Sequence, residues 1–589
     1  MKRTMVLLAT LAALTAAPPA GAEDDAVFKA MRDELGRSVE KLQVEKLDKP
    51  YFIAYSVHER SVVSASASFG GLIDSNQQRS RYLTVEVRVG DPGLDNTSYL
   101  GPFSRPTGVV RMFGGMLTLP LDDDYAEVRR QIWLATDAAY KGALEDLSKK
   151  RAYLQNKTRS DDAPDFTREG AQTTLDTPAP VLLKSAEAEA WVKELSLLFR
   201  ELPEVATGSV RMEASNVLTR YLNSEGTSFT RLTPLVSWVV SAATQAADGT
   251  PLDDFVTAYG RSIADLPSRD SLARQVREMG ARLSARRQAP ALDTYNGPVL
   301  FEGQAAAELV AQVLAPRLLA IRPPIVADPR LEISVSALAN PFIERLGSRI
   351  LPEFLSVSDQ PLLASHAGTP LVGGYKVDDE GVPAKETLLV EGGRLKTLLS
   401  TRSGVRSLRQ SSGSRRGAGP QPSNLVITAS KGLSQADLKQ ELLKLAAGRG
   451  QSFGVIVRRV GNAAFRVSRD PASFSGFAGG PPNAPRVEAG LVAYKVFPDG
   501  HQELLRGVEI AGLGPEAFKD VVAASEAGSA YSAPFKSPSA QLPLALPGGR
   551  GATLVSLVTP WLLFEEVNLT RLSGDIPQPP VAKHPFFDK

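Results

Sequence analysis

Five arginines lie close together in the segment Thr401 to Gly417, which also contains five serines and no acidic residue. A guanidinium group presents paired donors in one plane, so this segment could bind an anion or the carboxylate of a peptide. The same composition is equally typical of a solvated, flexible loop. The sequence leaves both interpretations open for these arginines, which are Arg402, Arg406, Arg409, Arg415 and Arg416.

The side chains that most often bind zinc are scarce. The chain has four histidines and no cysteine, so it has no disulfide, no thiol nucleophile and no thiolate ligand. His58, His366, His501 and His584 lie far apart, and no pair has the spacing of ligands on one element. The patterns GxSxG, GxGxxG and HExxH are absent. The sequence therefore holds no local metal motif, although distant loops could still converge in the fold.

The N-terminal half of the chain has the patterns of several helices and strands. Apolar residues at three- and four-residue steps predict helices over 24–44, 122–157, 186–202 and 268–287. Alternating patterns predict strands over 51–59, 62–69 and 81–89, and more strands within 205–247. The acidic trio Asp122 to Asp124 suits a helix N-terminus, where negative charge meets the helix dipole. The polar stretch 161–180 is predicted to be an exposed loop.

The pattern changes after the linker-like residues Gln288 to Pro290. One helix over 304–321 and another over 434–447 are predicted there, among strands over 424–429, 453–460 and 553–564. Hairpins are predicted over 386–400, around Gly392-Gly393, and over 491–506, around Pro498-Asp499-Gly500. We therefore expect an α+β protein, with a mixed α/β N-terminal domain over residues 23–290 and a mainly antiparallel β domain over residues 291–589.

Length and charge exclude some classes of protein. A chain of 589 residues is too long for one core and implies more than one domain. Lys and Arg number 67 and Asp and Glu number 65, so the formal net charge is only +2. This balance gives no electrostatic reason to expect nucleic acid or an acidic membrane surface as a partner.

The first residues have the order of a secretory signal. Lys2 and Arg3 precede an apolar stretch over 5–17, and Ala20-Gly21-Ala22 has the small-residue pattern of a cleavage site. The apolar stretch is shorter than the roughly 20 residues that a membrane-spanning helix needs. We expect cleavage after Ala22, a periplasmic or secreted mature protein, and no stable membrane insertion.

Weak motifs between residues 296 and 510 occur in the order typical of the TldD/PmbA family, which includes modulators of DNA gyrase and metallopeptidases. The chain resembles this family at Val299-Leu300-Phe301 before the helix from Gln304, at Asp378-Asp379-Glu380-Gly381 (its D-x-E-G), at the hairpin Leu389 to Leu395, at Ser412-Gly413 with Arg416 (its S/T-G-x-x-R), and at Pro422-Ser423-Asn424 before a strand. Segments 88–91 and 95–97 resemble long, exported relatives.

The resemblance implies a peptide-degrading system. This chain departs from the family pattern at the metal ligands. Active members carry H-E-x-x-x-H on the helix after the first C-terminal strand, with further His and Cys ligands. Here that helix reads AAAELVAQVLA from Ala305 to Ala315. Glu308 remains, but we expect it to cap the helix or to face solvent. The chain thus resembles the metal-free, PmbA-like (TldE) subunit, so no cofactor is expected in this chain and zinc is expected in a partner.

What the resemblance implies for function is a non-catalytic subunit in a heteromer with a TldD-like paralogue that carries H-E-x-x-x-H. Such a subunit would wall a chamber in which an extended peptide pairs with strand edges. The loop 402–424 is a candidate for this wall. The candidate peptide-binding residues, for which structural roles remain an alternative, are Asp379, Gly381, Gly413, Arg416 and Asn424.

Two other functions stay open. The first is a peptidase that acts alone with relocated metal ligands, such as His366, His501, Asp379 and Glu380. The second is a stand-alone envelope binding or assembly protein on a reused peptidase fold, because a fold does not determine a function.

Overall fold

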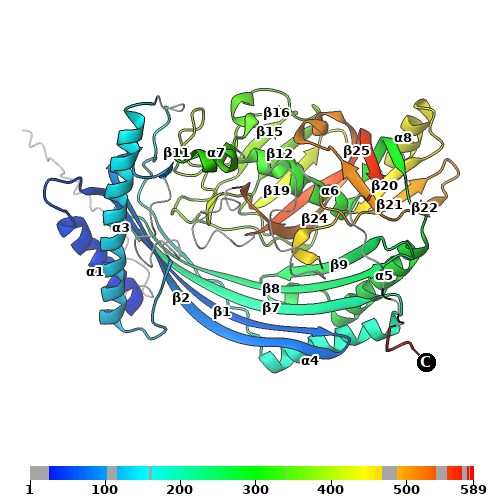
Figure 1. The fold of residues 1–589 in the computed structure, drawn as a ribbon, viewed down its shortest axis with the longest axis horizontal. Coiled ribbons are helices and arrows are strands. Elements are labelled where there is room, and N and C mark those ends of the chain that lie inside the picture. The colour runs from blue at the N-terminus through cyan, green and yellow to red at the C-terminus, as the bar shows by residue number, and fades with distance from the viewer. Residues whose placement is uncertain are drawn as a thin grey trace, which may run out of the picture.

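The structure is a computed structural model of the chain. It describes residues 25–101, 116–157, 162–336, 338–466, 487–538 and 553–572, together with residues 580, 582 and 584–588. The predicted signal segment, residues 1–22, lies outside the described residues. Within them the chain forms two layers, each built on a large sheet (Figure 1).

The lower layer of Figure 1 is a long, curved sheet of eight strands in the order β3-β2-β1-β7-β8-β6, with β5 beside β2 and β9 beside β8. Every pair in it is antiparallel except β6 with β8. The strands are β1 Pro50–Ser68, β2 Gly71–Asp91, β3 Leu94–Asp95, β5 Met116–Thr118, β6 Thr173–Asp176, β7 Thr207–Asn223, β8 Ser228–Gln245 and β9 Pro251–Gly260.

The strand β1 corrects the prediction of two strands over 51–59 and 62–69. It runs without a break and pairs with β7 from Ala54 to Ala67. The residues between the two predicted strands, Arg60 and Ser61, include neither Gly nor Pro, so nothing there forces a turn. The true turn lies at Phe69 and Gly70, where the backbone φ angles are 48° and 82°.

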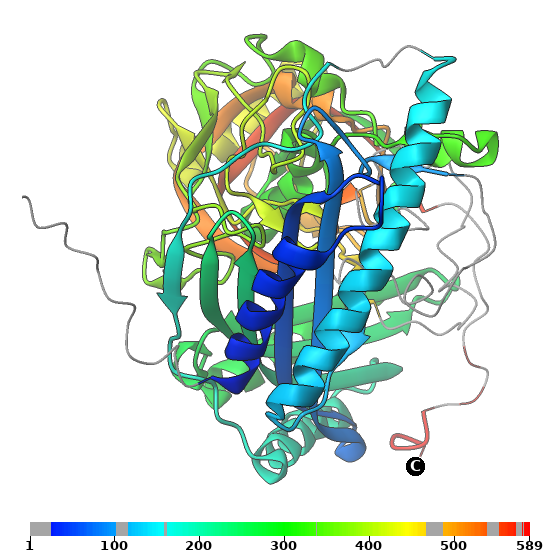
Figure 2. The ribbon, with the colours of Figure 1, turned by 90° about the vertical axis from the view of Figure 1, so that its left-hand side faces the viewer.

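Four helices cover one face of this sheet. They are α1 Ala26–Lys41, α3 Tyr125–Leu154, α4 Ser185–Leu197 and α5 Arg269–Gln288. Figure 2 shows α1 and α3 side by side across β1 and β2, where their apolar residues form one core with Tyr55, Val57 and Leu83. The helices α4 and α5 form a second core with β7 and β8. All four predicted N-terminal helices are thus present.

The upper layer is an eleven-stranded sheet in the order β16-β15-β12-β19-β25-β10-β20-β21-β22, with β23 and β24 paired to β25. Most pairs are antiparallel, and two are parallel: β10 with β20, and β19 with β25. The strands are β10 Thr294–Phe301, β12 Leu355–Asp359, β15 Thr387–Glu391, β16 Arg394–Leu395, β19 Asn424–Ala429, β20 Gly454–Arg459, β21 Val492–Val496, β22 Gln502–Leu504, β23 Val508–Ala511, β24 Val521–Phe535 and β25 Thr553–Arg571.

Short elements complete the described fold. The helices of the upper layer are α6 Gly303–Leu309, α7 Pro329–Ser336 and α8 Gln435–Gly448, and α8 packs on the side of the sheet that carries Leu300 and Ile456. Two-stranded pieces join β4 Tyr99–Leu100 to β11 Ile325–Val326, β13 Ser365–His366 to β14 Thr369–Pro370, and β17 Arg415–Arg416 to β18 Gly419–Pro420. Both predicted hairpins, β15–β16 and β21–β22, are confirmed, as is the α+β class.

The helix predicted over 304–321 is α-helical only as far as Leu309. One π-helical turn follows over Val310–Leu314, and then a 3₁₀ turn over Ala315–Leu318. Pro316 lacks a backbone N–H group, so the α-helical ladder cannot continue through it. The domain boundary proposed near residue 290 lies between α5 and β10, and it stays a prediction.

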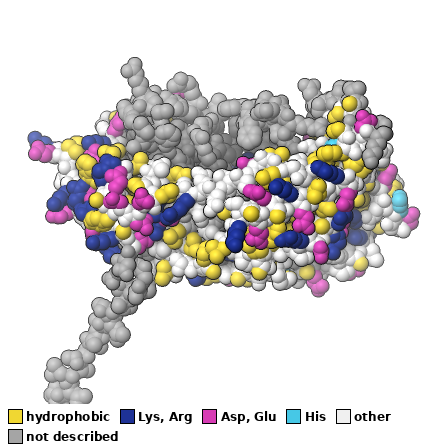
Figure 3. All heavy atoms as spheres, turned by 90° about the horizontal axis from the view of Figure 1, so that it is seen from below, with side chains coloured by type: hydrophobic (Ala, Val, Ile, Leu, Met, Phe, Trp, Pro, Cys, Tyr) yellow, Lys and Arg dark blue, Asp and Glu magenta, His cyan; other side chains and the backbone are white. Residues whose placement is uncertain are grey.

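The stretch predicted as an exposed loop over 161–180 is in part buried. Ala163, Asp165, Phe166 and Thr167 are almost inaccessible to solvent, and β6 adds an edge strand to the lower sheet. In the described part of the chain no helix is long and apolar enough to cross a membrane. Figure 3 shows the lower face of the molecule, where acidic and basic side chains of the described residues are interspersed.

Candidate functional site

Glu308 is the residue that the sequence resemblance aligns with the Glu of H-E-x-x-x-H. Its side chain is fully buried, which corrects the expectation that it caps α6 or faces solvent. Oε1 accepts hydrogen bonds from the Tyr531 hydroxyl at 2.6 Å and from Asn462 Nδ2 at 2.9 Å. Oε2 accepts one from Gln312 Nε2 at 2.8 Å. The carboxylate is therefore held by three donors, from the π-helical turn after α6, from β24 and from the segment after β20.

The electrostatics of this cluster follow from burial. Loss of solvent raises the pKa of Glu308, and the hydrogen bonds from Tyr531, Asn462 and Gln312 oppose that rise. Burial and the neighbouring Glu308 also raise the pKa of Tyr531 and of Tyr259, which lies on β9 in the lower sheet. The cluster thus lies near the boundary between the two layers.

The residues around Glu308 do not fit a zinc ion of the H-E-x-x-x-H type. Relative to Glu308, the two histidine positions are Ala307, which has no ligating atom, and Gln312, whose amide donates to Glu308 and to the Gly461 carbonyl. Among the described residues no group of three or more His, Asp or Glu side chains could hold a metal. A neutral amide and a phenol are poor substitutes for imidazole and thiolate as zinc ligands.

The relocated ligand set is not assembled either. His366 Nε2 contacts the Gly528 carbonyl at 3.1 Å, and His501 stacks on Phe497 beside the β21–β22 turn. Asp379 and Glu380 instead pair with arginines, Arg231 at 2.6 Å and Arg415 at 3.0 Å. Each of these four side chains thus has a partner that belongs to this chain.

The predicted D-x-E-G segment forms a tight turn between the layers. Asp378 is buried and accepts hydrogen bonds from the backbone amides of Glu380, Val382 and Arg415. Burial and the neighbouring Glu380 raise the pKa of Asp378 to about 8. Burial also acts to raise the pKa of Asp379, but the charge and hydrogen bond of Arg231 outweigh it and lower that pKa to about 2.

The two candidate glycines allow close approach of backbone segments. Gly381 has a φ of 79°, and a Cβ atom there would lie 2.5 Å from Thr227 Cγ2 in the lower layer. Gly413 has a φ of 71°, and a Cβ atom there would lie 2.5 Å from the Pro383 carbonyl oxygen. Both positions favour glycine for conformation and for packing.

Arg416 and Asn424 both bind backbone carbonyls of this chain. The Arg416 guanidinium donates to the carbonyls of Gly373, Pro422 and Leu554, at 3.2 to 3.3 Å. Asn424 Nδ2 donates to the Gln360 and Leu363 carbonyls, and its Oδ1 is buried without a hydrogen bond. The turn 378–382 is joined to Arg416 because the Gly417 amide donates to Asp379 Oδ2 at 2.7 Å. The five candidate residues are thus neighbours, each with contacts inside this chain.

The arginine-rich segment is mostly bound to the rest of the chain. Arg402 is 1% exposed, donates to the Thr167 carbonyl and pairs with Glu225 at 2.7 Å. Arg415 pairs with Glu380, and Arg409 reaches Asp162 at 3.0 Å. The flexible-loop interpretation is therefore wrong for Arg402, and the carboxylates that these arginines bind belong to this chain.

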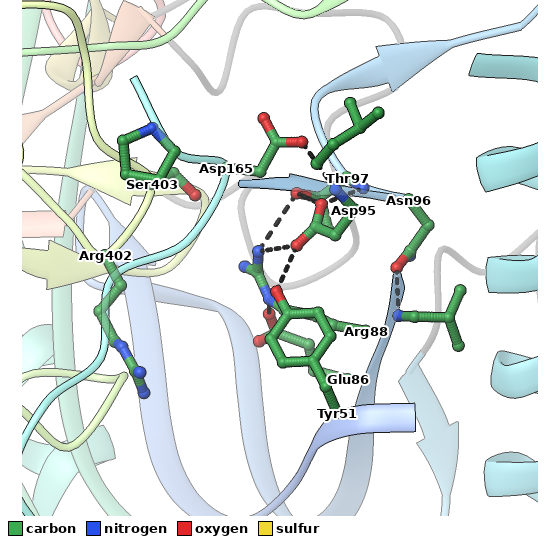
Figure 4. A network of polar contacts seen from close by, with 12 residues as sticks. Tyr51, Glu86, Arg88, Asp95, Asn96, Thr97, Asp165, Arg402 and Ser403 are labelled. Carbon is green, nitrogen blue, oxygen red and sulfur yellow. Dashed lines mark hydrogen bonds and ion pairs between the residues drawn. The ribbon is translucent and has the colours of Figure 1, made fainter. Parts of the chain in front are cut away.

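A polar network that sequence reasoning missed joins the layers near Arg402. Figure 4 shows Arg88 directed at Asp95, whose Oδ2 lies 2.9 Å from the guanidinium and 2.7 Å from the Tyr51 hydroxyl. The Asp95 amide donates in turn to Asp165 Oδ2. The guanidinium groups of Arg88 and Arg402 lie 3.6 and 3.8 Å from the ring centroid of Phe166. The family-like segments 88–91 and 95–97 were a sequence signal for the Arg88–Asp95 part of this network. No sequence pattern indicated that Phe166 would pack against the two arginines.

Comparisons with known proteins agree with this architecture. Residues 294–571 match the family of the PmbA/TldA metallopeptidase C-terminal domain. A metalloprotease of Methanocaldococcus jannaschii is 39% identical over 61 residues, which span 10% of this chain and only 12% of that protein.

Three solved structures share the fold. A proposed modulator of DNA gyrase from Thermotoga maritima has a TM-score of 0.58 at 15% identity and covers 92% of this chain and 100% of its own. TldE from Thermococcus kodakarensis has a TM-score of 0.56 at 14% identity, with the same two coverages. A proposed gyrase modulator from Bacteroides thetaiotaomicron reaches 0.54 at 11% identity, covering 92% of this chain and 98% of its own. The matched family model and the ordered motifs place residues 294–571 in the TldD/PmbA family, and the three solved structures show that the chain shares their fold.

Proposed function

We propose that this chain is the non-catalytic, chamber-forming subunit of an exported complex that degrades or processes peptides. The observation that carries the proposal is the environment of Glu308. Its carboxylate is bonded to Gln312, Asn462 and Tyr531, and Ala307 stands where a ligand would be needed. A glutamate held in this way has neither a metal nor a metal-bound water to act on.

The lower sheet supports a role in holding peptides. Along β8, Val236, Trp238 and Val240 are buried under α4 and α5, whereas Leu235 and Ser237 on the other face are only half-buried. That second face is turned toward the upper layer, on the concave side of the sheet (Figure 1). A sheet face of this kind can line a chamber, whereas main-chain pairing with an extended peptide takes place at the strand edges.

A catalytic partner follows from the same argument. If this chain supplies a wall and no metal, the hydrolytic site must come from another subunit. We propose a paralogue with H-E-x-x-x-H, which would bind zinc and activate water. Export of this chain, proposed from residues 2–22, requires the partner to be exported as well.

The experiment is a gentle purification of the chain from its native cell envelope, with identification of the proteins that accompany it. We expect a paralogue with H-E-x-x-x-H, and peptidase activity that is lost with the partner's motif. Glu308→Gln in this chain should leave the activity of the complex unchanged. Purification of this chain alone, from envelopes whose peptidase activity does not depend on it, would favour a binding or assembly role instead.

A further inference from the structure

The turn between β1 and β2 carries an unfavourable residue. A two-residue connection with positive φ at both positions is normally built from Asn, Asp or Gly. Here the first position is Phe69, with a φ of 48°. A bulky side chain in this region is a genuine outlier, and such outliers point to a function that the strain serves.

The end of α4 and the residues after it hold this turn in place. The Gly70 amide donates to Ser196 Oγ at 2.9 Å, and Arg200 Nε donates to the Phe69 carbonyl at 2.9 Å. The Phe69 ring lies 5.6 Å from the buried ring of Phe199. We define the tip surface as Phe69, Phe199 and Arg200.

The C-terminal segment of the chain lies on this tip surface. Figure 1 places the C-terminal end at the end of the long strands of the lower sheet. The ring of Phe69 lies 5.1 Å from that of His584 and 5.5 Å from that of Phe586, and the Arg200 guanidinium lies 4.8 Å from the Phe586 ring. His584 also contacts the ring of Phe587 at 5.4 Å, and its carbonyl accepts the Phe587 amide. The segment is thus a compact aromatic turn.

We propose that the tip surface is a recognition site for an aromatic segment of the type His-Pro-Phe-Phe, filled in this chain by its own residues 584–588. Two features of the site match this ligand. The Phe69 ring contacts the rings of His584 and Phe586, and Arg200 places a cation over that same Phe586 ring, at the distances that ring–ring and cation–π contacts require. The inference does not depend on the proposed function.

The linker makes binding within one chain favourable. From Leu572, which follows β25, to His584 the chain can span roughly 40 Å when extended. Because both sites belong to one chain, the segment 584–588 meets the tip surface at an effective concentration of about a millimolar. A peptide affinity of about 0.1 mM would therefore keep the site mostly occupied. The docked tail ties the end of the upper sheet to the far tip of the lower one.

The test uses the full chain with its tail disabled by Phe586→Ala and Phe587→Ala. A fluorescent peptide with the sequence of residues 582–589 is titrated against it, and anisotropy is measured. We expect saturable binding to the tail-disabled chain and at least roughly tenfold weaker binding to the unchanged chain, whose own tail competes. Phe69→Asn, added to the tail-disabled chain, should abolish binding while keeping the turn, because Asn suits that conformation.

The controls make each outcome decisive. A peptide with both phenylalanines replaced by alanine should not bind. Equal binding by the unchanged and the tail-disabled chain, or binding that survives Phe69→Asn, would overturn the proposal. A concentration-dependent dimer formed by the unchanged chain, but not by the tail-disabled one, would also overturn it, because the occupant would then be the tail of a second copy.

Discussion

At the scale of single residues, buried carboxylates accept hydrogen bonds that join distant parts of the chain. Glu308 and Asp359 are each 1% exposed or less, and both accept hydrogen bonds from donors far away in the sequence. The sequence showed that Glu308 matches the Glu of the family's metal motif, but it could not show that Asn462 and Tyr531 enclose it. Those residues are 154 and 223 positions away, and only the folded sheet brings them together.

Asp359 gives a pH-dependent prediction. Burial raises its pKa to about 7, against the hydrogen bonds from the Ser423 amide and hydroxyl. The folded state therefore keeps a proton up to about pH 7 that the unfolded chain loses near pH 4, so this group's contribution to stability falls as pH rises. The reference is Asp359→Asn, which does not titrate and can keep both bonds to Ser423. Between pH 4 and 8 the unfolding free energy of the natural chain should fall by roughly 2 to 4 kcal/mol relative to that variant.

The measurement is denaturant unfolding of both chains at several pH values, because shifts from other groups cancel in the difference. A difference in unfolding free energy that does not change with pH would contradict the assignment of the raised pKa to Asp359.

The candidate glycines give a second prediction at this scale. Gly381→Ala introduces a strained φ and a contact of 2.5 Å with Thr227, whereas Gly347→Ala, at a φ of 82°, meets nothing within 4 Å. We expect Gly347→Ala to cost about 1 kcal/mol, from conformation alone. Gly381→Ala should cost at least roughly 1 to 3 kcal/mol more because of overpacking. Equal losses in thermal or denaturant unfolding would show that Gly381 is not needed for the contact between the layers.

At the scale of elements, local patterns predicted the existence of helices well and their details less well. The helices α1, α3, α4, α5 and α8 follow from apolar periodicity. The continuity of β1 depends on its partners β2 and β7, and the edge strand β6 forms only because β8 offers a free edge at Ser228 to Arg231. Such pairings are non-local, and so the sequence alone did not reveal them.

The acidic trio before α3 gives the prediction for this scale. Asp124 Oδ1 accepts the Glu127 amide at 2.9 Å and so caps the helix, whereas Asp122 is exposed. Asp124→Ala should cost about 1 kcal/mol of unfolding free energy, whereas Asp122→Ala should be within about 0.5 kcal/mol of the natural chain. Equal effects of the two variants would mean that general negative charge, and not the cap, stabilises this end.

At the scale of the whole molecule, a polar and aromatic interface holds the two layers together. Arg231 pairs with Asp379 across it, and Arg402 reaches both Thr167 and Glu225. The sequence indicated both halves and a cluster of arginines. It could not assign the arginines to partners, because their carboxylates lie in segments that are joined only by the assembly of the layers.

Phe166 tests this interface. Its ring lies between the guanidinium groups of Arg88 and Arg402, at 3.6 and 3.8 Å. Phe166→Leu keeps an apolar side chain but removes both cation–π contacts, each worth about 2 kcal/mol when desolvated. Phe518→Leu is the matched control, since Phe518 is 1% exposed and, within the described part of the chain, its ring packs against the ring of Phe564.

We expect Phe166→Leu to be the less stable variant by at least about 2 kcal/mol. It should also separate the unfolding of the lower layer from that of the upper layer, when the lower layer is followed by Trp238 fluorescence in a background that replaces Trp133, Trp191 and Trp561 by Phe. Equal stability of the two leucine variants would mean that the ring of Phe166 does not contribute through the arginines.

The central claim is that this chain forms part of a peptidase without supplying its metal site. The most direct measurement takes the purified mature chain, exposes it to zinc, removes loosely bound metal, and assays zinc content and cleavage of an unstructured peptide, with and without the H-E-x-x-x-H partner. The account predicts neither stoichiometric zinc nor cleavage by this chain alone, and both when the partner is added. Stoichiometric zinc and peptide cleavage by this chain alone would contradict it.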